Sequence, residues 1–85
     1  MKVYVIQTKM DDDFVYETCR DSWIETEAGA FTSFDEAMKK AKEIAFGHGS
    51  ITRELENGYF VENGHDIGYW INASFTILVE EMELH

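Results

Sequence analysis

The alternation of apolar and polar positions in the first third of the chain predicts extended structure. In the segment 2–9, apolar side chains fall on both faces of the expected strand, which is typical of a strand covered on both sides. Residues 10–13 are mostly aspartate and are expected to form a polar turn. A strand over 14–20, a bend at 21–22 and an extended piece over 23–26 follow. This part of the chain is therefore expected to be a hairpin with an extended tail.

A change of period from two to 3.6 predicts a helix from Phe34 to about residue 46. Ser33 with Glu36 three positions later is a capping-box signature, in which the serine oxygen accepts the Glu36 amide and the carboxylate reaches back. The apolar stripe of this helix consists of Phe34, Ala37, Met38, Ala41, Ile44 and Ala45. Gly47 is expected to end the helix.

Two Asn-Gly dipeptides, at 57–58 and 63–64, indicate that the chain after the helix forms a meander of hairpins. The strands that they predict lie at residues 51–56, 59–62 and 67–71. A bend at Asn72 and Ala73 then leads into a long apolar strand over 74–84. We expect this last strand at the centre of the sheet, beside residues 3–8.

Together these elements predict a single α+β domain over residues 1–85. It has an antiparallel sheet of about four to six strands with one amphipathic helix, about residues 34–46, packed on one face. A second domain is excluded because 85 residues cannot supply two stable cores. Since several strands carry apolar residues on both faces, the face without the helix needs another cover. Three alternatives could cover this face: the sheet's own loops, a second copy in a homodimer, or a foreign partner.

The composition is strongly acidic, with 17 Asp and Glu against 7 Lys and Arg and a net charge of -10. An apolar content of 45% indicates a folded chain rather than a disordered acidic segment. Direct binding to nucleic acid or to an anionic membrane is disfavoured, because both require clustered Lys and Arg. The apolar run near Met1 is interrupted at Gln7 before a signal-peptide core is complete, so we expect a cytoplasmic protein. The lone Cys19 fits a reducing compartment and is interpreted as a small, half-buried apolar residue.

No catalytic motif is present in the sequence, so we expect a protein without enzymatic activity, cofactor or metal. Nucleophile motifs, phosphate-binding loops and zinc-binding helix strings are all missing. Residues 11–13 lack the spaced oxygens of a calcium loop and are interpreted as a solvated turn. Glu62, His65 and Asp66 lie within five residues and could chelate a divalent ion, which leaves a small metal-dependent enzyme as an alternative.

The excess charge lies outside the predicted helix. Residues 34–46 contain three acids and three lysines, whereas residues 1–33 contain seven acids against three bases and residues 47–85 contain seven against one. Three glutamate pairs are separated by two positions: Glu25 with Glu27, Glu54 with Glu56, and Glu81 with Glu83. On a strand, such pairs share a face about 6.6 Å apart, which is similar to the spacing of phosphates along a nucleic-acid strand.

This spacing favours a binding function directed at a basic partner. A folded surface with fixed negative charges could occupy the basic groove that a nuclease or DNA-binding protein keeps for its nucleic acid. The residues expected to bind the partner are Glu25, Glu27, Glu54, Glu56, Glu62 and Asp66, with Trp23, Tyr59, Tyr69 and Trp70 as aromatic anchors. The alternative explanation of the acidity is solubility alone, in a homo-oligomeric structural or accessory module.

In its general features the chain resembles the small proteins that bacteriophages use against host defence, notably anti-CRISPR proteins. These features are small size, strong acidity, a lone cysteine, one capped helix between antiparallel strands, and many surface aromatics. The resemblance implies an inhibitor in the host-cell cytoplasm that mimics nucleic acid and blocks a basic nucleic-acid-binding protein such as a CRISPR effector. Residues 31–37 and 81–84 are also similar to short bacterial and phage proteins, which imply no function.

Overall fold

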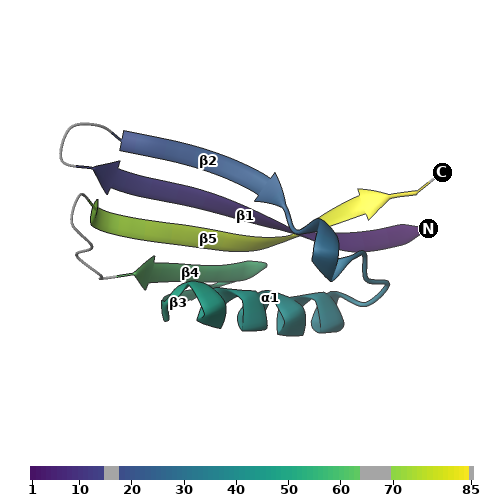
Figure 1. Ribbon diagram of the computed structural model, residues 1–85. Coiled ribbons are helices and arrows are strands. Elements are labelled where there is room, and N and C mark those ends of the chain that lie inside the picture. Colours follow the sequence, from purple (N-terminus) through teal and green to yellow (C-terminus); the bar gives the residue numbers. More distant parts are fainter. Residues whose placement is uncertain (15–17, 64–69, 85) are drawn as a thin grey trace.

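The computed structural model describes residues 1–14, 18–63 and 70–84, with side chains for residues 1–11, 21–62 and 74–84. Within them the chain forms one five-stranded antiparallel sheet and one α-helix packed against it (Figure 1). In chain order the elements are β1 (Lys2–Phe14), β2 (Thr18–Ile24), the 3-10 helix η1 (Thr26–Ala28), α1 (Phe34–His48), β3 (Ser50–Leu55), β4 (Gly58–Asn63) and β5 (Trp70–Glu83). The strand order is β2-β1-β5-β4-β3, which confirms the predicted α+β fold.

The long strands β1 and β5 form the centre of the sheet, as predicted for the last strand. They are antiparallel from the pair Lys2 and Glu83 to the pair Asp13 and Asn72. Their outer ends bring the two chain termini together, where the Leu84 amide donates to the Met1 carbonyl oxygen at 2.8 Å. The molecule is elongated along these strands, with a longest extent of 45 Å.

Three predicted interruptions of the strands are wrong. Residues 10–13 are part of β1 and pair with β2 on one side and β5 on the other, so they form no turn. The bend at 21–22 lies within the continuous strand β2, and the bend at 72–73 lies within β5. Polar residues are accommodated in these strands because neighbouring strands satisfy their backbone groups, an effect that local sequence patterns do not contain. The predicted strand at 67–71 lies mostly outside the described residues.

The β3–β4 hairpin turns at Glu56 and Asn57, one position earlier than predicted. Leu55 is directly opposite Gly58, and neither turn residue has a positive φ, so the turn is not the type I′ turn expected for Asn-Gly. Gly58 instead permits a close approach of two strands. A Cβ atom at this position would overlap the Ile77 carbonyl oxygen and lie 3.0 Å from its carbonyl carbon.

The helix begins at Phe34 as predicted and ends at His48, two residues later than expected. The Ser33 hydroxyl oxygen accepts the Glu36 amide at 3.3 Å, which confirms the N-cap. Gly47 does not end the helix; the helix continues to its cap at Gly49, whose amide donates to Ala45. The last turn is held by the His48 ring, which stacks on Phe75 with ring centroids 4.3 Å apart.

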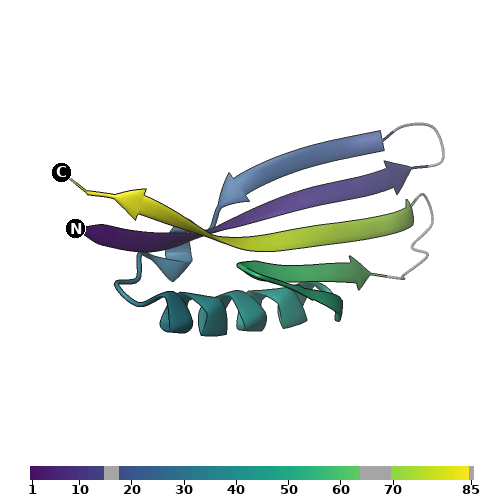
Figure 2. The ribbon, with the colours of Figure 1, turned by 180° about the vertical axis from the view of Figure 1, so that it is seen from behind.

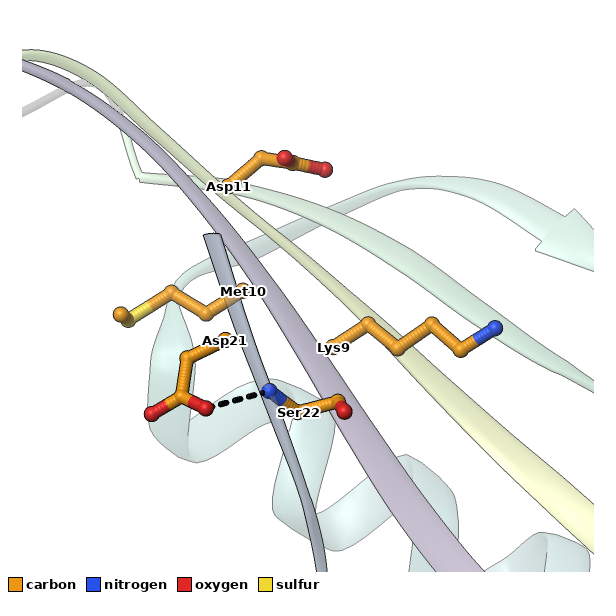
Figure 3. A pocket seen from close by; sticks show the side chains of 5 residues that line it. All are labelled: Lys9, Met10, Asp11, Asp21 and Ser22. Atoms are coloured by element: carbon orange, nitrogen blue, oxygen red, sulfur yellow. Dashed lines mark hydrogen bonds between the residues drawn. The ribbon is translucent and has the colours of Figure 1, made fainter. Parts of the chain in front are cut away.

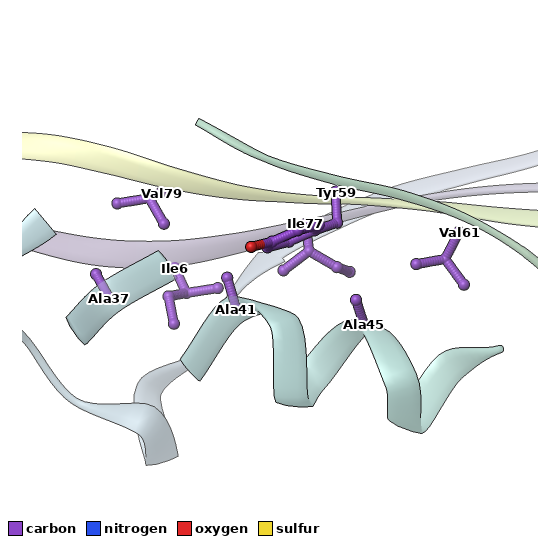
Figure 4. Close-up of a cluster of buried hydrophobic side chains, with 8 residues drawn as sticks. All are labelled: Ile6, Ala37, Ala41, Ala45, Tyr59, Val61, Ile77 and Val79. Atoms are coloured by element: carbon purple, nitrogen blue, oxygen red, sulfur yellow. The ribbon is translucent and has the colours of Figure 1, made fainter. Parts of the chain in front are cut away.

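The core lies between α1 and one face of the sheet (Figure 4). Ala37, Ala41 and Ala45 are fully buried and face the sheet, and their small side chains allow the helix to lie close to it. The sheet contributes Ile6, Tyr59, Val61, Ile77 and Val79 to this cluster. The helix is only about 22 Å long at 1.5 Å per residue, whereas β1 spans about 43 Å. Figures 1 and 2 accordingly show β1 and β5 extending beyond both ends of the helix.

Candidate interaction surface

Three exposed carboxylates lie on the β3–β4 hairpin, which we call the acidic hairpin: Glu54, Glu56 and Glu62. Glu54 is opposite Tyr59 on the helix side of the sheet, Glu56 is in the turn, and Glu62 is opposite Ser50 on the other side of the sheet. The nearby cation Arg53 lies over the Phe60 ring, with its guanidinium carbon 5.4 Å from the ring centroid. Within the described residues, none of the three carboxylates forms an ion pair. Among the described residues, the three negative charges are therefore set against the single positive charge of Arg53.

Glu25 and Glu27 do not share a strand face, contrary to the expectation. Glu25 follows β2 and precedes η1, and Glu27 lies within η1. The Glu25 Oε1 atom accepts hydrogen bonds from the Thr8 hydroxyl at 2.6 Å and from the Trp23 indole N–H at 2.8 Å. Thr8 is fully buried, so this carboxylate satisfies a buried hydroxyl group. Glu25 and Trp23 thus stabilise the fold locally, and Glu27 alone of this pair is exposed.

The two predicted groups of glutamates lie at opposite edges of the sheet. Glu25 follows edge strand β2, whereas Glu54 belongs to edge strand β3. Four strand spacings separate these edges, a distance of about 19 Å. Glu25 and Glu27 line a hollow with Lys40 of α1, which also pairs with Glu43 at 3.3 Å. Because they lie at opposite edges of the sheet, the two groups do not form one continuous acidic surface.

Glu81 and Glu83 are the one predicted pair that lies entirely on a strand. Both carboxylates are matched by cations, because Glu81 binds the Lys2 ammonium at 3.1 Å and Glu83 binds the N-terminal ammonium at 3.2 Å. The hydrogen bond to Glu81 and the charge of that carboxylate raise the pKa of Lys2 above its ordinary value. A phosphate-like spacing is thus present here, but neighbouring cations neutralise it.

The predicted aromatic anchors are divided between the core and residues outside the described part. Tyr59 is only 9% exposed and packs in the core, so its prediction as a surface anchor is wrong. The strand alternation places Tyr59 and Val61 toward the helix and Phe60 away from it. Trp70 begins β5, but its side chain lies outside the described residues. Asp66 and Tyr69 lie outside them altogether.

A second hollow lies between β1 and β2 and is lined by Lys9, Met10, Asp11, Asp21 and Ser22 (Figure 3). The Asp21 carboxylate accepts the Ser22 amide at 2.8 Å. Lys9 and Asp21 extend in different directions, as expected from a register in which Lys9 is opposite Ser22 and Met10 is opposite Asp21. The charged groups of this hollow therefore do not converge on a common point. Among the described side chains, Lys9 forms no ion pair.

The described part of the chain contains no group of three or more His, Cys, Asp or Glu side chains arranged to hold a metal ion. Two of the three residues considered for metal binding, His65 and Asp66, lie outside that part. In the same part, no helix has the length and apolar character needed to cross a membrane. Comparison of the chain with protein-family models, curated proteins and solved structures finds no match.

Sequence reasoning missed two residues near Glu25. Thr8 donates a hydrogen bond to Glu25, and Lys40 lines the same hollow as Glu25. The burial of Thr8 is predictable from the sequence, because Thr8 is two positions after the apolar Ile6 and therefore shares its face of the strand. The position of Lys40 depends on how η1 meets α1, and no local pattern contains that information.

Proposed function

We propose that this protein is a non-enzymatic, acidic binding protein that inhibits a basic, nucleic-acid-handling protein. The observation that carries this proposal is the acidic hairpin, whose three exposed carboxylates have no cationic partner among the described residues. Net negative charge on this hairpin attracts a basic groove over a distance of about one Debye length, roughly 10 Å at 0.1 M salt. The favoured mode is occupation of the surface that the partner uses for nucleic acid.

The proposal depends on the charge of the hairpin rather than on a regular phosphate-like spacing. Glu54 lies on a strand and Glu56 in a turn, so their carboxylates are not held in strand register. The regularly spaced pair at Glu81 and Glu83 is neutralised by cations. The specific form that we propose is an anti-defence protein acting on an effector such as a CRISPR nuclease, in keeping with the resemblance in size and acidity.

The experiment that tests this proposal is capture from a bacterial lysate on the immobilised protein, followed by competition with duplex DNA. We expect the retained proteins to bind nucleic acid, to be released by added DNA, and to elute as the salt concentration rises. The variant Glu54→Lys/Glu56→Lys should retain much less of them. The matched control is Glu36→Lys/Glu43→Lys on α1, which changes the net charge equally at exposed positions and should retain them. Retention that is indifferent to DNA and to salt would contradict the proposal.

A further inference from the structure

The sheet face opposite α1, which we call the outer face, has an uncharged row of residues that crosses all five strands. Gln7 lies opposite both Ile24 and Leu78, and Gly58 lies opposite both Leu78 and Leu55. Directly opposed residues share a face, so these five positions form one line, the Leu78 row. Ile24 is 45% exposed, and Leu55 and Leu78 are half-buried. No described element covers this row.

Charged residues of opposite sign flank the Leu78 row on its two sides. The row on one side contains Lys9 in β1 and Arg53 in β3, both exposed. The row on the other side contains Glu80 in β5, opposite Val5. Within the described side chains, neither Lys9 nor Glu80 forms an ion pair. In a chain of net charge -10, the outer face thus has an uncharged centre with Lys9 and Arg53 in the next row on one side and Glu80 in the next row on the other. Asp11 and Glu62 lie one row beyond the cations.

We propose that the outer face binds the outer face of a second copy, with a two-fold axis along the Leu78 row. Rotation about this axis exchanges the two flanking rows, because each lies one row from the axis. Lys9 of each copy is then placed over the row that contains Glu80 of the other copy, and the two Leu78 rows stack on each other. Each dimer gains two Lys9–Glu80 pairs at the edge of an uncharged centre, as in sheets that pack face to face.

The size of the outer face suits such a dimer. Five strands at about 4.8 Å spacing give a width of about 24 Å, and the strands average about 30 Å in length. The resulting area is on the order of 700 Å², close to the roughly 800 Å² that each partner buries in a typical specific interface. This inference goes beyond the proposed function, because it involves no foreign partner and does not depend on Glu54 or Glu56.

The test is the mass of the full chain by sedimentation equilibrium from about 1 µM to about 500 µM, a range that detects micromolar dissociation constants. We expect wild type to reach twice the 9.9 kDa mass of one chain. Lys9→Glu should raise the dimer dissociation constant by about tenfold or more, because it replaces two attractive pairs with two repulsive ones. The charge exchange Lys9→Glu/Glu80→Lys should restore the wild-type constant.

The matched control is Lys42→Glu, which makes the same charge change at an exposed helix position without an ion pair among the described residues. It should dimerise like wild type, apart from the small effect of two additional negative charges on each chain. A monomeric wild type at the highest concentration would overturn the inference. So would equal effects of Lys9→Glu and Lys42→Glu, or a failure of the charge exchange to restore the dimer that Lys9→Glu dissociates.

Discussion

Replacement of Gly58 by alanine is the most direct test of the close contact between β4 and β5. Gly58 pairs with Leu55 on one side and Leu78 on the other. An alanine Cβ would overlap the Ile77 carbonyl oxygen, lie 3.0 Å from its carbonyl carbon and lie 3.1 Å from the Leu78 Cα. These atoms belong to the backbone of the central strand and cannot rotate away. The substitution therefore forces β4 and β5 apart.

The magnitude follows from the contacts that this separation breaks. Next to Gly58, the Val79 amide donates to the Asn57 carbonyl oxygen at 2.7 Å, and the Asn57 side-chain amide donates to the Val79 carbonyl oxygen at 3.2 Å. Two such hydrogen bonds contribute about 1 kcal/mol each, and a crowded packing defect costs about 1–3 kcal/mol. We expect the free energy of unfolding to fall by about 3–5 kcal/mol. At about 4–8 °C per kcal/mol, the melting temperature should fall by more than about 12 °C.

The assay is urea denaturation followed by circular dichroism, with Gly47→Ala as the matched control. Gly47 lies within α1, and a Cβ there has no atom within 4 Å. The control should therefore be more stable than wild type by about 0.5–1 kcal/mol, because alanine favours the helix. If Gly58→Ala is as stable as wild type, or if both variants shift in the same direction, the deduced contact between β4 and β5 is refuted.

Three further substitutions test the helix cap, the helix–sheet contact and the buried hydrogen bonds by the same denaturation assay. Ser33→Ala should cost about 1 kcal/mol, whereas Ser33→Asp should retain most of the cap; equal losses would contradict the capping role. Ala41→Leu should cost about 1–3 kcal/mol because Ala41 is fully buried against the sheet, and the exposed control Lys42→Leu should change little. Glu25→Ala should cost about 1–3 kcal/mol, because the Trp23 indole N–H and the buried Thr8 hydroxyl both lose their acceptor. Glu25→Gln, which retains an oxygen acceptor, should cost less.

The sequence predicted the elements whose signals are local. The helix from Phe34 follows from the Ser33 cap and the three- and four-residue spacing of its apolar residues, and the structure confirms both. The central position of the last strand follows from its length and apolar character. The propensity of Asp11 and its neighbours opposes a strand and predicts a turn, but pairing with strands on both sides overrides that propensity.

The candidate surface was less predictable because it depends on how separate elements meet. Glu25 and Glu27 would share a face only if both lay on a strand, but η1 begins between them at Thr26. The burial of Tyr59 depends on which face of β4 meets the helix. Because tyrosine has both an apolar ring and a polar hydroxyl, its residue type does not predict whether it is buried. The neutralisation of Glu81 and Glu83 requires the two chain ends to be adjacent, which only the pairing of β1 with β5 establishes.

The central claim, that the acidic hairpin binds a basic surface, is tested most directly by the association rate with a captured and purified partner. The measurement compares wild type with Glu54→Lys/Glu56→Lys at about 50 mM and about 500 mM salt, conditions in which charge attraction is weakly and strongly screened. We predict that the wild-type association rate falls steeply with salt. We also predict that the variant associates at least about tenfold more slowly at low salt, with a much smaller change in its dissociation rate. Equal association rates for the two proteins, independent of salt, would contradict the claim.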